Sequence, residues 1–198
     1  MNKVREYDAI TIGASAGGMN LVQDMASKLI KDFSMAVILV QHIANNSDGR
    51  WITLLDSTSP LTIKEAEEKE QIERGKIYIA PPNYHLLVEN DFTFSLTVDE
   101  KVNYARPSID VFFETASWVF GNRLVGIILS GGNSDGAKGL KSIKDRGGFT
   151  IVQDPKSAES PSMPLAAINL VKPHAILNPN EIWEFLLDIH KQIQSDKT

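Results

Sequence analysis

Residues 8–25 constrain the fold of this chain more than any other segment. Residues 9–12 form a short, mostly apolar run of the kind that makes a buried strand. The run is followed by small residues only, Gly13-Ala14-Ser15-Ala16-Gly17-Gly18, and a helix-like pattern begins at Met19. This order of strand, tight turn and helix predicts an α/β domain whose first turn lies at the carboxyl end of a buried strand.

The turn matches the nucleophile-elbow pattern G-x-S-x-G, with the serine at position 15. In that motif, small neighbours allow a sharp turn that holds the serine hydroxyl above the end of the sheet. The first N–H groups of the helix that follows can stabilise a negative charge, such as a developing oxyanion. Ser15 is therefore a candidate nucleophile, and the backbone of Ala16 and Gly17 is a candidate part of an oxyanion hole.

A glycine-rich turn after the first strand can instead bind phosphate, and Gly17-Gly18 would then be the binding site of a nucleotide. A dinucleotide-binding G-x-G-x-x-G needs glycine where this chain has Ser15, and no Gly-Lys-Ser/Thr follows to make a P-loop. The choice between the two functions depends on whether the chain supplies a base for the serine.

A histidine ends the second predicted strand. Residues 35–42 contain a continuous apolar run that is typical of a strand covered on both faces, and its polar end is His42. A strand, a helix and a strand at this spacing form a right-handed βαβ unit with parallel strands. Ser15 and His42 are therefore expected at the same edge of the sheet, where open α/β sheets bind ligands. A structural or solvent-exposed histidine is the alternative interpretation.

An aspartate follows a third buried strand. Residues 124–129 are mostly apolar, and residues 130–137 form a glycine-rich loop that contains Asp135. A parallel sheet would bring this aspartate to the edge that carries Ser15 and His42. The alternative interpretation is an N-cap of the helix that begins at residue 137, because aspartate often occupies that position.

The rest of the pattern predicts a doubly wound, mostly parallel α/β sheet flanked by helices, with a β-hairpin insertion. Further strands are predicted at 61–63, 76–80, 149–153 and 175–177, a hairpin at 86–96, and helices at 19–32, 47–57, 108–120, 137–146, 164–170 and 181–189, the last with a frayed polar tail. Residues 64–70 are charged and are interpreted as a solvated connection. No repeat or linker divides the chain, so a single domain over residues 1–198 is expected.

Composition excludes several classes of protein. The chain has no cysteine, so disulfides, thiolate metal sites and cysteine nucleophiles are absent. Its net charge of -5 and its lack of a basic cluster argue against a nucleic-acid partner. No apolar run approaches the ~20 residues of a membrane span, and the N-terminus lacks the apolar segment of a signal peptide. These features predict a cytoplasmic protein without membrane insertion, and no metal or cofactor is expected.

The three strand-end residues have the types that a serine hydrolase needs: a nucleophile, a base, and an acid that fixes the tautomer of the imidazole. Their order along the chain is Ser15, His42, Asp135, whereas α/β-hydrolases have the order serine, acid, histidine. The same triad occurs on unrelated folds, so the order is compatible with catalysis but does not indicate membership of that family.

Several motifs occur in a fixed order over nearly the whole chain. They are Ile12–Gly18, Val40–His42, Ile79–Pro81 with His85–Leu86, Arg106–Phe113, Leu129–Ala137 and Met163–Pro164. In these motifs the chain resembles the catalytic domain of the chemotaxis protein-glutamate methylesterases, the CheB type. The resemblance implies a doubly wound domain that hydrolyses methyl esters of glutamate side chains on chemoreceptors and, in many members, deamidates glutamines there. It places the nucleophile on Ser15, the base on His42 and the orienting acid on Asp135.

The resemblance also implies methyl-accepting chemoreceptors as the protein substrate and chemotaxis signalling proteins as further partners. It places Arg106 and Met163 on the substrate side of the site and Gly132 in a loop beside the scissile carbonyl.

The chain departs from well-studied relatives in two respects. They carry methionine at the position of Gly132, and they carry a phosphorylatable receiver domain for which these 198 residues have no room. A catalytically inactive homologue that only docks to receptors is a third functional alternative.

The two interpretations of Asp135 predict different effects of an Asp135→Asn substitution. Asparagine is also a good N-cap, so a capping role would leave stability and activity almost unchanged. In a triad, the amide would stabilise the wrong imidazole tautomer, and turnover would fall by up to ~10⁴-fold, as in a serine protease. We expect a variant that melts near the wild-type temperature and releases almost no methanol from an ester substrate.

Overall fold

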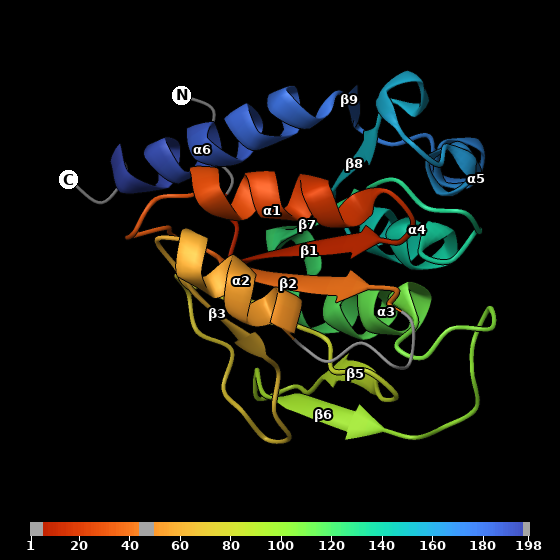
Figure 1. The fold of residues 1–198 in the computed structure, drawn as a ribbon, viewed down its shortest axis with the longest axis horizontal. Helices are drawn as coiled ribbons and strands as arrows, with labels where there is room; N and C mark the ends of the chain where they lie inside the picture. The colour runs from red at the N-terminus through yellow and green to blue at the C-terminus, as the bar shows by residue number, and fades with distance from the viewer. Residues whose placement is uncertain (1–5, 44–49, 196–198) are drawn as a thin grey trace.

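The structure is a computed structural model that describes residues 6–43 and 50–195. Within these ranges the chain forms a seven-stranded sheet with helices on both faces, and a separate antiparallel hairpin (Figure 1). The strands are β1 (Ala9–Ala14), β2 (Ala36–Gln41), β3 (Thr62–Glu65), β4 (Lys76–Ile79), β7 (Leu124–Ile128), β8 (Phe149–Gln153) and β9 (Ala175–Leu177), with β5 (His85–Val88) and β6 (Phe94–Thr97) in the hairpin. The helices are α1 (Gly18–Lys28), α2 (Arg50–Thr58), α3 (Ile109–Phe120), α4 (Ala137–Asp145), α5 (Ser162–Val171) and α6 (Pro179–Ser195).

The strand order places the N-terminal strand in the middle of the sheet. The order is β3-β4-β2-β1-β7-β8-β9, and every neighbouring pair of the described strands is parallel. Ala14 at the end of β1 pairs with Gln41 of β2, and Gly13 pairs with Ile128 of β7. The carboxyl ends of these three strands therefore meet at one edge, at the right in Figure 1. The predicted doubly wound fold with a β-hairpin is confirmed.

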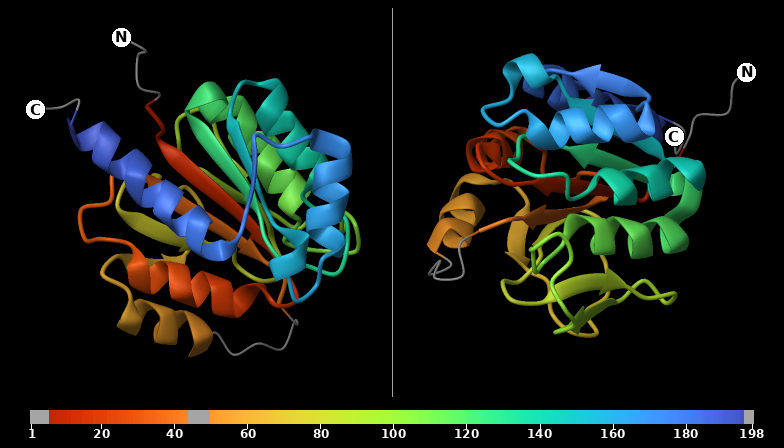
Figure 2. Two further views of the ribbon diagram at one scale, coloured as in Figure 1. Left: turned by 90° about the horizontal axis from the view of Figure 1, so that it is seen from above. Right: turned by 90° about the vertical axis from the view of Figure 1, so that its right-hand side faces the viewer.

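Both faces of the central strands are covered, which explains their continuous apolar sequences. Val37 and Leu39 of β2 pack in the core beneath α1, α2 and α6. Ile38 and Val40 pack in the core beneath α3, α4 and α5. Figure 2 shows the sheet between these two layers of helices. In the described ranges, every helix is too short or too polar to cross a membrane.

Helix α5 begins at Ser162, two residues before its predicted start, and the bounds of α1 and α6 also differ from the prediction. Helix α1 ends at Lys28, before residues 31–32, because Leu29 adopts an extended backbone with φ -66° and ψ 157°. Helix α6 begins at Pro179, earlier than predicted. The Glu181 N–H donates to the side chain of Asn178, whose own N–H donates to the Glu181 carboxylate at 2.8 Å. This is a capping box, which the sequence pattern of asparagine and glutamate three residues apart indicates. The predicted helix over 47–57 is described from Arg50 onward, and residues 47–49 lie outside the described ranges.

The prediction of a frayed polar tail after residue 189 is wrong, because α6 continues to Ser195. Ile193 is buried in the core, and the ring of His190 stacks on Phe33. Nδ1 of that ring also accepts a hydrogen bond from the backbone N–H of Ser34 at 3.1 Å. These contacts join the last two turns of the helix to the segment just before β2, which the polar composition of the tail did not indicate.

Helices α3 and α4 approach each other closely at a glycine. A Cβ atom on Gly139 would lie 2.5 Å from Cβ of Phe113 and 3.0 Å from the backbone of Asp110. Both distances are shorter than van der Waals contact, so only glycine fits between the two helices at this point. The close approach brings the N-terminal ends of α3 and α4 together at the carboxyl edge of the sheet.

A Gly139→Ala substitution tests this packing. Alanine favours helix formation by about 1 kcal/mol relative to glycine, but overpacking here costs about 1–3 kcal/mol and acts on two backbones. We expect a net loss in the free energy of unfolding, measured by urea denaturation. Gly132→Ala is the matched control, because a Cβ there meets no atom within 4 Å. Equal stability of the two variants would contradict the packing argument.

Candidate active site

The structure brings the three predicted residues to neighbouring strand ends. Ser15 follows β1, His42 follows β2, and Asp135 lies in the loop between β7 and α4. The N–H of His42 donates to the carbonyl of Ala14 at 3.0 Å, and the N–H of Ser15 donates to the carbonyl of Ser130 at 2.9 Å. The turn that carries Ser15 is therefore joined by backbone hydrogen bonds to the strand ends on both sides of it.

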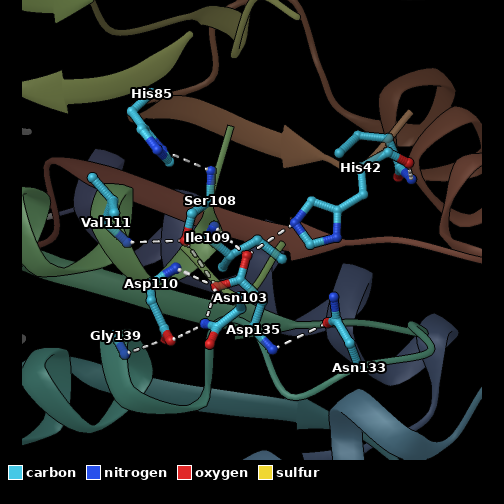
Figure 3. A network of polar contacts seen from close by, with 11 residues as sticks. His42, His85, Asn103, Ser108, Ile109, Asp110, Val111, Asn133, Asp135 and Gly139 are labelled. Atoms are coloured by element: carbon cyan, nitrogen blue, oxygen red, sulfur yellow. Dashed lines mark hydrogen bonds and ion pairs between the residues drawn. The ribbon is translucent and has the colours of Figure 1, made fainter. Parts of the chain in front are cut away.

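The imidazole of His42 contacts the carboxylate of Asp135. Its Nε2 lies 2.9 Å from Oδ2 (Figure 3). The Asp135 side chain is fully buried, whereas the His42 side chain is 15% exposed. A carboxylate oxygen accepts the hydrogen of Nε2, which leaves Nδ1 of the neutral ring as a proton acceptor. The pair therefore has the arrangement of a base whose tautomer is fixed by an acid.

Asp135 accepts hydrogen bonds from five donors. Its Oδ2 also accepts from the N–H of Ile109 at 2.7 Å. Its Oδ1 accepts from the Ser108 hydroxyl at 2.8 Å, the Asn103 amide at 2.9 Å and the Asp110 N–H at 3.2 Å. Two of these donors are the first N–H groups of α3, which carry partial positive charge. Both oxygens are thus fully used, and the carboxylate has one fixed orientation.

These donors determine the charge of Asp135. Burial alone would raise the pKa of its carboxyl group. Hydrogen bonds from His42, Asn103, the Ile109 N–H and Ser108 outweigh burial, and they hold this pKa below its ordinary value. The group is therefore ionised at neutral pH although it has no contact with solvent.

The alternative role of Asp135 as the cap of its own helix is wrong. Helix α4 has Gly136 as its N-cap, with φ 94° and no side-chain hydrogen bond. The carboxylate of Asp135 instead binds N–H groups of α3. In return, the carboxylate of Asp110 in α3 accepts from the Gly139 N–H in the first turn of α4 at 2.7 Å. The two helices exchange caps, and the amide of Asn103 donates to both carboxylates at 2.9 Å.

The pKa of the Asp110 carboxyl group is shifted in the opposite direction to that of Asp135. Burial raises the pKa of Asp110, and the negative charge of Asp135 raises it further. Hydrogen bonds from Gly139 and Asn103 act against this rise but do not cancel it. The Asn103 amide therefore donates to two different carboxyl groups. Asp135 is held in its ionised form, whereas the ionised form of Asp110 is disfavoured.

The turn that carries Ser15 has a left-handed backbone at Gly17, as its glycine-rich sequence suggests. Gly17 has φ 77°, and a Cβ atom there would lie 2.5 Å from Cβ of Glu159, so a larger residue does not fit. The Ser130 hydroxyl donates to the carbonyl of Ala16 at 2.7 Å and fixes the peptide that follows Ser15. Within the described residues, the N–H groups of Ala16 and Gly17 donate to no acceptor. Both N–H groups are thus available to a ligand, and their role as an oxyanion hole remains a prediction.

Gln41 joins the turns that carry the serine and the histidine. It is 3% exposed, and its Nε2 donates to the carbonyl of Ser15 at 2.9 Å and to the carbonyl of His42 at 3.1 Å. The sequence pattern placed Gln41 at the end of an apolar strand and gave it no role. Its polar side chain at that point was the only available signal.

The three remaining predicted residues occupy different environments. Gly132 is exposed, and a Cβ there meets no atom within 4 Å, so the backbone at this position leaves room for a side chain to begin. Met163 is fully buried beneath Gly131, so any effect it has on a substrate is exerted through that loop. Arg106 lines a cleft together with His42, and its guanidinium donates to the carbonyl of Asp99 at 2.9 Å.

Asn103 is a site residue that the sequence did not indicate. It lies outside every predicted element, and its partner Asp135 is 32 residues away. Ser108 was predicted at the start of the helix over 108–120, as its N-cap or in its first turn, and the structure makes it the N-cap of α3, whose hydroxyl accepts from the Val111 N–H. Its second contact, with Asp135, depends on the close approach of α3 and α4. Within the described residues, no cluster of His, Asp and Glu side chains has the arrangement of a metal site.

A doubly wound α/β sheet that brings a serine, a histidine and a buried aspartate to one edge is typical of a serine hydrolase. Comparison with known protein families gives a more specific result. The family model described as CheB methylesterase matches residues 10–186. The chain therefore belongs to the CheB methylesterase family.

Individual relatives agree with this assignment. A provisionally named protein-glutamate methylesterase/protein-glutamine glutaminase of Leptospira interrogans is 50% identical over 181 residues, which are 91% of this chain and 94% of the relative. The enzyme of that name from Pyrococcus horikoshii is 38% identical over 163 residues, which are 81% of this chain but 44% of the relative. The crystal structure of the Thermotoga maritima CheB methylesterase catalytic domain matches with a TM-score of 0.88 and 30% identity, covering 93% of this chain and 99% of that one.

The structure changes the expected stability of the Asp135→Asn variant. An asparagine amide would place an NH₂ group against donors that now bind a carboxylate oxygen, so the contacts lead us to expect a melting temperature below that of the wild type. Leaving buried donors without an acceptor costs about 3 kcal/mol. We expect a loss of this size in the free energy of unfolding at pH 7. Asp188→Asn is the control, because that side chain is 62% exposed on α6.

The lowered pKa of Asp135 predicts that the stability difference between wild type and Asp135→Asn depends on pH. Because the folded protein lowers the pKa of Asp135, its carboxylate stabilises the fold above the unfolded-state pKa, and this contribution is lost as the pH falls through the lowered pKa. The difference in stability between wild type and Asp135→Asn should be complete at neutral pH and shrink below about pH 4. Urea denaturation between pH 7 and 3 measures it, and a constant difference would contradict the assigned charge.

Proposed function

We propose that this chain is a serine hydrolase that removes the methyl group from glutamate methyl esters on chemoreceptors, and that the same site deamidates receptor glutamines. The contact between Nε2 of His42 and the buried carboxylate of Asp135, beside the turn that carries Ser15, is the observation that carries the proposal. The names of the relatives support the two substrates.

In the first step, the Ser15 hydroxyl attacks the ester carbonyl. His42 accepts the serine proton at Nδ1, because its Nε2 is engaged with Asp135. The N–H groups of Ala16 and Gly17, which donate to no acceptor within the described residues, bind the oxyanion of the tetrahedral intermediate. The imidazolium then returns the proton to the leaving oxygen, and methanol departs from an acyl-enzyme on Ser15.

In the second step, water attacks the acyl-enzyme. The neutral imidazole of His42 takes a proton from the water and then protonates Ser15 as that oxygen leaves. The product is a free glutamate side chain. A glutamine substrate follows the same route, with ammonia leaving in place of methanol, so one site accounts for both activities in the names of the relatives.

A nucleotide site at Gly17-Gly18 gains no support from these contacts. The Gly18 N–H already donates to the carbonyl of Ser15 at 3.0 Å, so it is not free for a phosphate. A phosphate site also leaves the contact between His42 and a buried negative charge unexplained. The inactive-homologue alternative is weakened by the same contact, because a receptor-docking protein has no need of an oriented base.

The proposal includes the setting in which this chemistry occurs. Chemoreceptors are the protein substrate, chemotaxis signalling proteins are partners, and the enzyme acts in the cytoplasm. The CheB-type domain is assigned to residues 1–198, and the matched residues 10–186 support this assignment.

Methanol release tests the nucleophile. A chemoreceptor signalling fragment is methylated with tritiated S-adenosylmethionine and incubated with each protein. We expect release by the wild type and a loss of at least about 10³-fold in Ser15→Ala, because the variant has no hydroxyl to form the acyl-enzyme. Ser27→Ala, which changes an exposed serine on α1, is the control and should keep full activity. Equal release by Ser15→Ala and wild type would overturn the assignment of the nucleophile.

The pH–rate profile tests the base. Activity should rise with pH on the acid side of the profile, because the imidazole of His42 accepts the serine proton only in its neutral form. In His42→Ala this acid limb should disappear together with most of the activity. A wild-type profile that is flat from acid to neutral pH would count against His42 as the base.

A further inference from the structure

A tight two-residue turn lies beside the candidate active site. Val102 and Ala105 exchange two backbone hydrogen bonds, of 3.2 and 2.9 Å. The two central residues both have left-handed backbones, with φ 50° at Asn103 and φ 63° at Tyr104. Positive φ at both central positions is the geometry of a type I′ turn, in which asparagine followed by glycine is the preferred pair.

The first central residue fits this preference. Asparagine adopts positive φ more readily than most residues, and the Asn103 amide points inward to Asp110 and Asp135 (Figure 3). It is a positioning residue, because it acts on the candidate triad only through Asp135. The identity of this residue is therefore explained by the backbone and by the site.

The second central residue does not fit. Glycine is favoured at this position, and a bulky side chain with positive φ is strained. Tyr104 nevertheless occupies it, and its side chain is 98% exposed. The ring thus has almost no contact with the rest of the described structure, and the fold gains nothing from it. A residue that is unfavourable for the turn and useless for packing is best explained by contact with another molecule.

The turn also lies in the right place for a substrate contact. Tyr104, Lys101 and Arg106 line the same cleft as His42. Among the described residues that line this cleft there is no carboxylate. The cleft therefore continues from the candidate base to an exposed aromatic ring. Among its described lining residues, the lysine and the arginine carry positive charge, which suits a chain segment that has both apolar and acidic side chains.

We propose that Tyr104 is a substrate-binding residue that contacts the polypeptide on either side of the esterified glutamate. The inference rests on the proposed function, and it names the part of the protein substrate that the cleft recognises. The aromatic ring supplies apolar contact area, and Lys101 and Arg106 attract neighbouring carboxylates of the same segment. Recognition of this segment is separate from the chemistry at Ser15, because Tyr104 lies on the outer side of the turn and Asn103 on its inner side.

A Tyr104→Gly substitution separates binding from folding. Glycine is the preferred residue of the turn, so the melting temperature should equal or exceed that of the wild type. Loss of an interfacial tyrosine should raise KM for the tritium-methylated chemoreceptor fragment by about fivefold or more, with kcat within about twofold of wild type. Tyr104→Phe keeps the ring and should behave like the wild type. Trp118→Ala removes a ring that is 67% exposed near the other end of α3, and it should change neither constant.

A binding measurement tests the inference without catalysis. In a Ser15→Ala background, Tyr104→Gly should weaken equilibrium binding of the methylated fragment by about the same factor as it raises KM. Unchanged KM and unchanged binding would overturn the inference, and so would a fall in kcat alone, which would point to an effect through Asn103. If the wild type released no methanol while the Tyr104→Gly change still weakened binding, the proposed function would fail and the docking role would stand.

Discussion

The buried carboxylate of Asp135 is the interaction on which the candidate active site depends. An unpaired charge in a fully buried position would be strongly unfavourable, so the five donors around it are a requirement of the fold. They come from the end of β2, from the turn at Asn103 and from the start of α3. If one of these segments moved, its buried donor would lose the Asp135 carboxylate as acceptor. The buried charge of Asp135 would lose a hydrogen bond at the same time. The geometry of His42 is therefore determined by the same contacts that hold the two helices at the edge of the sheet.

The exchange of caps between α3 and α4 explains why two neighbouring carboxyl groups differ in charge. Asp135 has the imidazole and four other donors, which hold its pKa below the ordinary value in spite of burial. Asp110 has fewer donors, and burial and the charge of Asp135 raise its pKa. Two negative charges so close together would repel each other, and the unequal supply of hydrogen bonds decides which of them ionises more readily. Gly139 is essential here, because its missing side chain lets the helix ends come this close.

The fold and the three strand-end residues were predictable because their signals are local. Buried parallel strands have continuous apolar sequences, and Ser15, His42 and Asp135 each follow such a strand, so one rule about parallel sheets places them at one edge. Asn103 and Gln41 could not be found in this way, since their contacts depend on how loops and helices pack after the sheet has formed. The extension of α6 to Ser195 was missed for the same reason: its stabilising contacts, with Phe33 and Ser34 just before β2, are tertiary.

The chemical type of the donors matters as much as their number. Apart from His42, the groups that bind Asp135 are an amide, a hydroxyl and two peptide N–H groups, all of them neutral. They keep the carboxylate ionised without balancing its charge. Among the described residues, no lysine or arginine forms an ion pair with it. When His42 takes the serine proton, the imidazolium is therefore the first full positive charge next to Asp135, and their attraction in a low-dielectric interior favours the charged intermediate. A lysine in place of Asn103 would also satisfy the carboxylate, but it would weaken this attraction before the reaction begins.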